Sequence, residues 1–300
     1  MAVAADQRYP SPLRYPGGKG KIANYIKLVI LDNDLVGCEY VEPYAGGASI
    51  ALSLLFEEYA DRIHINDINR GVFAFWDTAL RNPDELCRRI QSVPLDVTEW
   101  LRQRAIQRDP NADPVDLGFA TFYLNRTSRS GIIGGGVIGG LDQSGHWKID
   151  ARFNRGQLIR RLQRIGRFAS RITLTSHDAA QYLTEVLPGL ERPFVYLDPP
   201  YYTNGAKLYE NWYAADDHAA IAATVRRLGV PWIVSYDAVP EVAELYTSFA
   251  RIGYELHYSA AIGNLSGSEL MFFSPGLVAP SVASPAGVRS KVVDQARLAG

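Results

Sequence analysis

The sequence predicts an α/β fold in which a mostly parallel sheet is formed by two stretches of chain, separated by an inserted, mainly helical segment. Two observations support this prediction. Short apolar strands alternate with segments of helical period before residue 70 and after residue 150, which is typical of a parallel sheet flanked by helices. Between these limits the runs NPDELCRRIQSV, TEWLRQRAIQRD and DLGFATFYLNR have helical period, and a glycine-rich stretch follows them.

Composition bounds the class of protein. With 300 residues, 47% hydrophobic and 21% charged, the chain has the profile of a globular protein of one or two domains. No apolar run reaches the roughly 18 residues that a membrane span needs, and the N-terminus lacks the layout of a secretory signal. We therefore expect a cytoplasmic protein that does not enter a membrane. The net charge of -1 gives no global sign of a polyanionic partner.

The segment RYPGGKGK, residues 14–21, precedes the apolar run IANYIKLVIL. It does not match a phosphate loop, because Tyr15 stands where the first glycine belongs and Ile22 where a serine or threonine would bind magnesium. We expect a glycine-rich turn leading into a helix, where backbone N–H groups and a lysine can receive a small anion such as a carboxylate. An ordinary basic start of a helix is the alternative.

Residues 40–42 predict a strand, PYAGGA a glycine loop, and the following run a helix capped by Ser49. The next strand, RIHIND, ends at Asp67. Gly46 and Gly47 occupy the first turn between strand and helix, and Asp67 follows Gly47 by 20 residues. At this spacing a carboxylate commonly accepts hydrogen bonds from ribose hydroxyls, so we expect an adenosyl ligand. A plain turn with an exposed aspartate is the alternative.

The strand FVYL leads into DPPYY. Two prolines end the strand directly after Asp198 and make the backbone rigid, with Tyr201 displayed beyond them. The Asp198 carboxylate and the Pro199 carbonyl can accept the hydrogens of an exocyclic amine on a nucleobase and hold its lone pair in a reactive geometry. Tyr201 can stack on that base, which must leave the duplex to arrive here. A proline-terminated strand with an exposed acid is the alternative.

Further strands are predicted in RITLTSHD, VPWIVSYD and YELHYSAAI, and a helix in DDHAAIAATVRRLG. The pattern divides the chain into a discontinuous core of residues 1–69 and 151–275, an insert of residues 70–150, and a tail of residues 276–300. The tail is rich in Pro, Ala, Ser and Gly and is expected to be disordered.

The two cysteines, Cys38 and Cys87, have no metal-site spacing, so we expect no metal and a reducing compartment. Neither follows a proline at a strand end, where a nucleophile for methylation of a cytosine ring carbon would be needed. That reaction is therefore disfavoured.

Together, these motifs resemble the Dam-like, or D12-class, DNA adenine N6-methyltransferases over roughly residues 13–273. The resemblance implies a Rossmann-like S-adenosylmethionine-dependent methyltransferase core with an inserted, mainly helical target-recognition module. On the motifs RYPGGK, VEPYAGGA, INDIN and TSHDA it implies that the cofactor S-adenosyl-L-methionine is bound by Tyr15, Gly17, Gly18, Lys19, Glu42, Pro43, Gly46, Gly47, Asp67 and Asp178. On DPPY it implies the catalytic residues Asp198, Pro199, Pro200 and Tyr201.

The segment FYLNRTSRSG resembles the part of the recognition module that contacts DNA. It lies where the family places that part, between the ribose-binding acid, Asp67, and the catalytic tetrad DPPY, residues 198–201. The resemblance implies DNA binding by Asn125, Arg126, Ser128, Arg129 and Ser130. Family members often carry an aromatic residue and then Asn before the glycine, whereas this chain has Arg129 and Ser130, so the recognised sequence is not predicted. Arg126 and Arg129 can contact phosphate or a guanine edge. A glycine-rich surface loop with solvated arginines is the alternative.

The resemblance thus implies a site-specific enzyme that methylates the exocyclic amino group of a flipped adenine in double-stranded DNA. Methylation of a cytosine amino group, or of RNA or a protein amide, uses related chemistry, and a DNA-binding protein of this fold without activity is a further alternative. We expect a monomer, and a cognate restriction nuclease is a partner that the resemblance allows.

Overall fold

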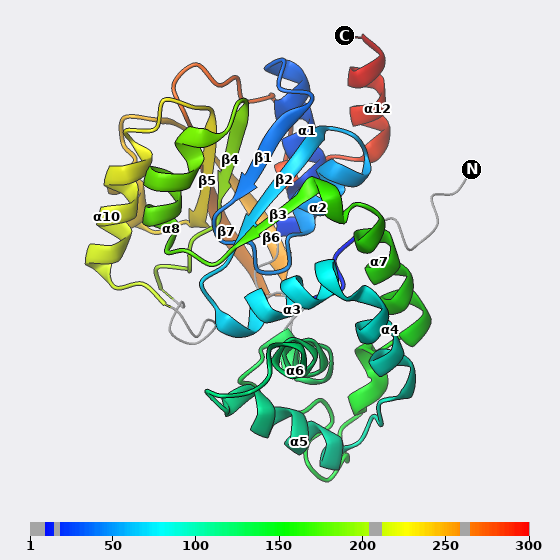
Figure 1. Cartoon of the computed structure of the whole chain (residues 1–300). Helices are drawn as coiled ribbons and strands as arrows, with labels where there is room; N and C mark the ends of the chain where they lie inside the picture. Colours follow the sequence, from blue (N-terminus) through cyan, green and yellow to red (C-terminus); the bar gives the residue numbers. More distant parts are fainter. Residues whose placement is uncertain (1–9, 15–18, 204–211, 259–264, 300) are drawn as a thin grey trace.

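The computed structural model describes residues 10–14, 19–203, 212–258 and 265–299. At its centre is a seven-stranded sheet of order β3-β2-β1-β4-β5-β7-β6 (Figure 1). The strands are β1 (Cys38–Glu42), β2 (Ala60–Asn66), β3 (Ile172–Thr175), β4 (Pro193–Leu197), β5 (Trp232–Asp237), β6 (Ala250–Tyr258) and β7 (Leu265–Phe273). The predicted α/β fold with a mostly parallel, Rossmann-like sheet is confirmed.

Five strands, β3-β2-β1-β4-β5, run parallel, and β7 and β6 form an antiparallel hairpin at one edge. The order reverses between β1 and β4, because the chain builds outward from β1 to β2 and β3 and returns to place β4 on the other side of β1. In open sheets this reversal point is where ligands bind. Strand β7 was missed by the sequence analysis: it begins LSGS, and turn-forming residues obscure its pattern.

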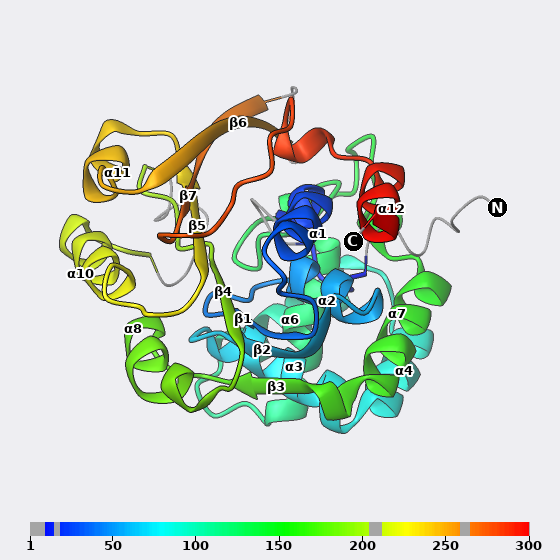
Figure 2. The ribbon, with the colours of Figure 1, turned by 90° about the horizontal axis from the view of Figure 1, so that it is seen from above.

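Helices cover both faces of the sheet (Figure 2). In β4, Phe194 and Tyr196 join the apolar cluster on the side of α1 and α2, while Val195 and Leu197 join the cluster on the side of α8, α10 and α11. This alternation explains why the strand is apolar at every position. The α-helices of the described chain outside residues 70–150 are α1 (Ala23–Asp32), α2 (Ser49–Phe56), α7 (Arg155–Arg167), α8 (Ala179–Gln181), α10 (Ala215–Val225), α11 (Pro240–Leu245) and α12 (Ser290–Ala299). Among the described residues, no helix has the length and apolar character to cross a membrane.

The segment after β2 is helical, as predicted, and forms one end of the molecule (Figure 1). It contains α3 (Arg70–Arg81), α4 (Pro83–Ser92), α5 (Val97–Arg108) and α6 (Pro114–Thr127). Phe75 of α3 stacks on Phe122 of α6 with ring centroids 5.8 Å apart, and both belong to the same apolar cluster as the sheet. The core is therefore continuous with the sheet, and the division into separate domains stays a prediction.

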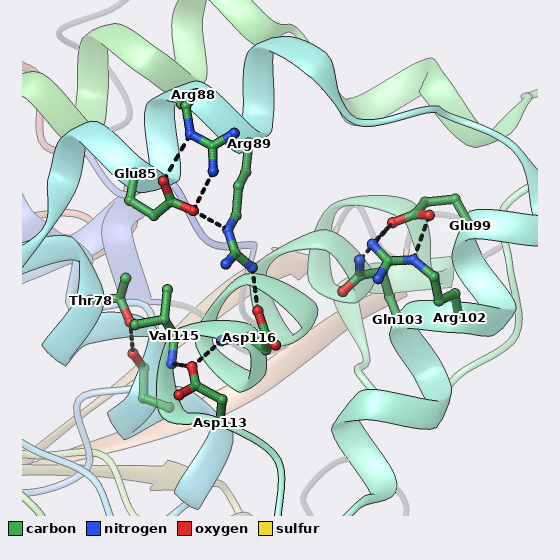
Figure 3. Close-up of polar contacts among 11 residues, drawn as sticks. Thr78, Glu85, Arg88, Arg89, Glu99, Arg102, Gln103, Asp113, Val115 and Asp116 are labelled. Atoms are coloured by element: carbon green, nitrogen blue, oxygen red, sulfur yellow. Dashed lines mark hydrogen bonds and ion pairs between the residues drawn. The ribbon is translucent and has the colours of Figure 1, made fainter.

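Polar contacts hold these helices together at their surface (Figure 3). Asp113 precedes α6 and accepts hydrogen bonds from the N–H groups of Val115 and Asp116, which are the first-turn donors that a helix leaves unsatisfied. Arg89 of α4 pairs with Glu85 of its own helix and with Asp116 of α6, both at 2.6 Å. Arg89 thus links α4 to α6.

The expectation of a disordered tail over residues 276–300 is wrong. Residues 276–299 are described, and their last turns form α12, which packs on α1 and buries Val293. The extended stretch before it is tied down by Asn33, whose side chain donates to the Val278 carbonyl at 2.9 Å and accepts from the Val278 N–H at 2.7 Å. A composition rich in Pro, Ala and Ser did not reveal these contacts, because their partners lie about 245 residues earlier.

Candidate active site

A cavity of about 480 Å³ lies at the carboxyl ends of β1, β2 and β4, where the strand order reverses. It brings together residues of five separate sequence motifs. The predicted site residues that line it are Lys19, Glu42, Pro43, Gly46, Gly47, Asp67, Asp178, Asp198 and Pro200. Tyr15, Gly17 and Gly18 lie outside the described residues. The size is in the range of about 300–1,000 Å³ that small-molecule sites occupy.

The glycine loop after β1 is held by the acid after β2. Gly46 has a φ of +47°, a conformation that costs little only without a side chain, and its N–H donates to Asp67 Oδ2 at 2.8 Å. The Gly46 carbonyl accepts a hydrogen bond from the indole of Trp76 at 2.9 Å. Asp67 Oδ1 accepts the N–H of Asn69 at 2.9 Å. Burial raises the pKa of Asp67 to about 6, although these two N–H donors lower it.

Glu42, at the end of β1, caps the helix that follows the loop. The expectation that Ser49 caps α2 is wrong: Ala48 stands at the N-cap with a φ of +46°, and no side chain at that position accepts a hydrogen bond. Instead, Glu42 Oε1 accepts the N–H of Ala51 at 3.0 Å, within the first turn of the helix. Burial raises the pKa of Glu42 to about 8, so its carboxyl group is largely protonated at neutral pH.

Asn66, which the sequence analysis did not single out, joins three loops around the cavity. Its side-chain amide donates to the carbonyls of Pro43 and His177, both at 3.0 Å. Its oxygen accepts from the His177 N–H and the Thr175 hydroxyl, both at 2.8 Å. Asp178, the next residue, accepts two N–H groups at the start of α8 and lines the cavity. Asn66 could have been noticed in the sequence, because it is a polar residue at the last position of the buried strand β2.

Asp198 follows β4 and has two donors on one oxygen. Its Oδ1 lies 2.9 Å from Lys19 Nζ and accepts the Ser235 hydroxyl at 3.1 Å. Because Ser235 uses its hydrogen on Asp198, the contact of 2.7 Å with Tyr196 is donated by the tyrosine. No hydrogen bond from the described part of the chain reaches Asp198 Oδ2. Burial raises the pKa of Asp198, and Lys19 opposes that rise.

Lys19 is buried, and its ammonium group has three neighbours. Besides Asp198, it donates to the Tyr201 hydroxyl at 3.1 Å and lies 3.4 Å from Glu269 Oε2. The Tyr201 hydroxyl in turn donates to Glu269 Oε1 at 2.9 Å. Burial alone would lower the pKa of Lys19, but Asp198, Tyr201 and Glu269 raise it well above its usual value. The lysine is therefore a cation held by three oxygen-bearing side chains.

The residues of the DPPY tetrad, 198–201, are divided between the cavity and the interior. Pro200 lines the cavity and Pro199 is buried beside it. The chain beyond the tetrad is held by Asp237 at the end of β5, whose carboxylate accepts the N–H groups of Tyr202 at 2.9 Å and Thr203 at 3.1 Å. Rigid prolines and this acidic anchor together fix the course of the loop.

Tyr201 does not occupy the stacking position expected for it. Its ring is buried, lies 4.8 Å from the Lys19 ammonium, and is absent from the cavity lining. Besides Tyr196 of β4 and the imidazole of His177, three aromatic side chains line the cavity, those of Tyr44, Trp212 and Tyr213. Tyr44 and Tyr213 join their hydroxyl groups at 2.8 Å, and Trp212 is 55% exposed. Sequence reasoning missed all three, since nothing local distinguishes them from the other tyrosines and tryptophans.

Two of the residues expected to contact DNA are buried instead. Asn125 accepts the Arg14 N–H at 2.7 Å and donates to the carbonyls of Arg14 and Gly131 at 2.6 and 2.9 Å. Ser128 accepts the indole N–H of Trp100 at 3.2 Å. At Gly131 a Cβ atom would lie 2.4 Å from the Arg14 carbonyl oxygen. These residues thus hold the segment before the glycine-rich turn, and their DNA contacts are not supported by this conformation.

The other three residues of this segment, Arg126, Arg129 and Ser130, are less buried than Asn125 and Ser128. Arg129 is exposed and Ser130 is half-buried. Burial, together with the charges of Arg14, Arg161 and Arg152, lowers the pKa of Arg126 to about 9. Arg14 Nη1 and Arg126 Nε are buried without a hydrogen-bond partner among the described residues. The guanidinium groups of Arg14, Arg126 and Arg152, with that of Arg161 near Arg126, thus form a positive patch.

The sheet is doubly wound, and at its reversal point a glycine loop is hydrogen-bonded to an acid, beside a carboxylate that two prolines follow in the sequence. These features define a class of α/β enzymes that act on a nucleotide-like ligand. Residues 15–260 match the family of D12 class N6 adenine-specific DNA methyltransferases. The chain belongs to this family, which confirms the resemblance seen in its motifs.

Comparisons with individual proteins add little. No curated protein matches the chain. Among solved structures, the chain is similar to a putative RNA methyltransferase, PH1948, from Pyrococcus horikoshii, with a TM-score of 0.43 and 10% sequence identity over 88% of each chain. At this level the similarity bears on neither substrate nor mechanism.

Proposed function

We propose that the protein is a site-specific DNA methyltransferase that transfers a methyl group from S-adenosyl-L-methionine directly to the exocyclic amino group of an adenine flipped out of double-stranded DNA. The observation that carries the proposal is Asp198 in the cavity lining: Lys19 and Ser235 bind one of its oxygens, and the described residues leave the other for a substrate donor. The cytoplasmic location, the monomeric state and a companion nuclease stay predictions.

The cavity residues fit the cofactor. Gly46 and Gly47 let the backbone approach a ligand closely, and each Asp67 oxygen, after accepting one N–H, has a lone pair left for a ribose hydroxyl. Asp178 lines the same cavity. The bound cofactor would supply an electrophilic methyl group on a positively charged sulfur. We assign Lys19 to holding Asp198 rather than to the cofactor carboxylate, because its ammonium group already lies within 3.4 Å of oxygens of Asp198, Tyr201 and Glu269.

The chemistry needs an aligned amine rather than a covalent intermediate. The lone pair of an exocyclic amine is delocalised into the ring, so two acceptors on its hydrogens make it more nucleophilic by holding it near a tetrahedral geometry. Asp198 Oδ2 and the Pro199 carbonyl are the proposed acceptors. Trp212 and Tyr213, rather than Tyr201, are the aromatic side chains placed to contact the flipped base.

For the DNA, we propose contacts from Arg126, Arg129 and Ser130. The positive patch of Arg14, Arg126 and Arg152 suits backbone phosphates, which supply much of the affinity of such complexes without reading sequence. Exposed Arg129 is the residue of this segment best placed to reach a base edge.

The test is methylation of an unmodified DNA library by the purified protein and a labelled methyl donor, followed by modification-sensitive sequencing. We expect N6-methyladenine within one short sequence. Modified cytosine would instead support the cytosine amino-group alternative. Cofactor binding without methylation of any DNA would support a DNA-binding protein of this fold without activity.

A further inference from the structure

Glu269 lies in β7, outside every motif that the sequence analysis identified. In the sheet it pairs with Asp237 of β5 on one side and with Tyr254 of β6 on the other. Its side chain is 1% exposed, yet its carboxylate lies 3.4 Å from Lys19 Nζ and accepts the Tyr201 hydroxyl at 2.9 Å. An acid from the antiparallel part of the sheet thus reaches the carboxyl ends of the parallel strands, where the cavity lies.

Placing this acid in the interior is unfavourable on its own. A buried carboxylate loses its hydration, and the loss is offset only by close charges and hydrogen bonds. Lys19 cannot neutralise two carboxylates, so Asp198 and Glu269 share one ammonium group. Replacing a buried ion pair by apolar residues of similar volume often leaves a protein equally stable or makes it more stable. The arrangement therefore calls for an explanation beyond stability.

Geometry supplies that explanation. Lys19 follows two glycines in the sequence and reaches Asp198 through a long, flexible side chain, which has many rotamers when unanchored. Glu269 and the Tyr201 hydroxyl contact the ammonium from the interior and connect to each other, closing a ring of three groups. The ammonium is thereby held at one place, 2.9 Å from Asp198 Oδ1.

We propose that Glu269 is a positioning residue for methyl transfer. By anchoring Lys19 and Tyr201 it fixes the rotamer of Asp198, so that Oδ1 is held by the protein and Oδ2 is presented to the substrate amine. Glu269 itself contacts neither substrate nor cofactor. The inference rests on the proposed function, since it assigns Asp198 to holding the amine.

A double-mutant cycle tests the inference. Single-turnover transfer would be measured with saturating cofactor and DNA for the full-length wild type, Glu269→Gln, Lys19→Gln and the double variant. Glu269→Gln keeps the shape and an acceptor for Tyr201 but removes the charge that anchors the ammonium. We expect it to slow transfer by about tenfold or more, since misplacing a reacting group by a fraction of an ångström is costly, while the Kd values for cofactor and DNA change less than about twofold.

The coupling between the two positions is decisive. If Glu269 acts through Lys19, then Glu269→Gln should cost less than about twofold in the Lys19→Gln background. Multiplying effects would show that Glu269 acts independently, and a wild-type transfer rate in a less stable Glu269→Gln protein would show a purely structural role. Either result overturns the inference. Glu255→Gln, an exposed acid on the neighbouring strand β6, is the matched control and should transfer at the wild-type rate.

A second measurement does not depend on activity. The hydrogens of the Lys19 ammonium, observed by nitrogen-15 NMR, should exchange with water at least about tenfold faster in Glu269→Gln than in the wild type, and unchanged exchange would overturn the anchoring role. If Glu269→Gln does not fold, Tyr201→Phe removes the hydroxyl that joins both groups and should accelerate the same exchange. A wild-type protein that methylates no DNA but shows the expected exchange would refute the proposed function and leave the anchor in place.

Discussion

Charged groups are used differently at the two ends of the molecule. At the carboxyl edge of the sheet, Lys19 and Glu269 are almost completely buried, with side chains 2% and 1% exposed. In the helical segment, Arg88 pairs with Glu85 at 2.7 Å, and the two side chains are 68% and 21% exposed (Figure 3). Both contacts join opposite charges, but only the first removes them from water.

This difference sets the consequence of losing a partner. An exposed pair contributes about 0–1 kcal/mol, because water and salt screen it and each side chain can return to solvent. Removing one member of a buried pair leaves an uncompensated charge, which costs about 3–5 kcal/mol. The surface pairs of the helical segment can therefore change without loss of the fold, whereas the buried group restricts which residues can occupy the cavity edge.

The largest effect is expected from Lys19→Met. It removes the cation shared by Asp198 and Glu269, and we expect the free energy of unfolding to fall by about 3–5 kcal/mol in urea denaturation at neutral pH. Lys21→Met is the matched control, because Lys21 is exposed two residues away, and should change stability by less than about 0.5 kcal/mol. Equal stabilities of the two variants would mean that the buried group does not behave as one charge network.

Glu42 should make stability depend on pH. Its pKa is raised from 4.5 to about 8, so the folded state favours the protonated form. The corresponding stability is fully present below about pH 4.5 and is lost as pH rises through about 8. Glu42→Gln keeps an acceptor for Ala51 and cannot ionise. As pH rises across this range, its free energy of unfolding should increase relative to that of the wild type by up to roughly 4 kcal/mol.

Thermal unfolding of both proteins at pH 5 and pH 8.5 checks this dependence. Glu244→Gln, which changes an exposed acid in α11, is the control, and its difference from the wild type should stay nearly constant over the same range. If the wild type instead became more stable relative to Glu42→Gln as pH rises, this carboxyl group would be ionised in the folded protein.

Asp198→Ala should abolish most of the activity. We expect transfer to fall by a factor of about 100 or more, the size expected when a positioned catalytic group is removed, while cofactor binding stays measurable. Lys19 keeps Glu269 as its partner, so the variant should fold. Asp198→Asn retains one acceptor and should be impaired less than, or equally to, Asp198→Ala. Single-turnover methyl transfer measures both, and near wild-type transfer by Asp198→Ala would refute the assignment.

Asp67→Ala should weaken binding of S-adenosylmethionine by roughly 1–3 kcal/mol, because it removes a charged acceptor and releases the Gly46 N–H that it holds. Calorimetry on the folded variant measures the change. Asp61→Ala, an exposed acid on the same strand, is the control and should bind as the wild type does. An unchanged affinity in Asp67→Ala would remove the adenosyl assignment of this cavity.

The smallest effect is expected from Arg88→Ala on the helical surface. Because Glu85 keeps Arg89 as a partner, loss of its pair with Arg88 should lower the free energy of unfolding by less than about 1 kcal/mol, and by still less in 1 M salt. Urea denaturation at two salt concentrations measures both numbers. A cost as large as that of Lys19→Met would contradict the distinction between the two regions.

The sequence by itself determined the elements whose signals are local. Apolar runs marked β1 to β6, helical period marked α4 to α6, and prolines after Asp198 marked the end of β4, because each signal depends on neighbours within a few residues. Motif spacing also placed Gly46 and Asp67 at the same cavity, since the carboxyl ends of parallel strands meet at one edge of the sheet.

Only the tertiary structure decided which of these residues touch. Lys19 and Tyr201 are 182 residues apart, and Tyr201 and Glu269 are 68 apart, so no local pattern could pair them. For the same reason the sequence could not show that Asn125 bonds to Arg14, which lies 111 residues away. Burial and hydrogen-bond partners are properties of the folded chain, and these are what separate a residue that meets a ligand from one that holds it in place.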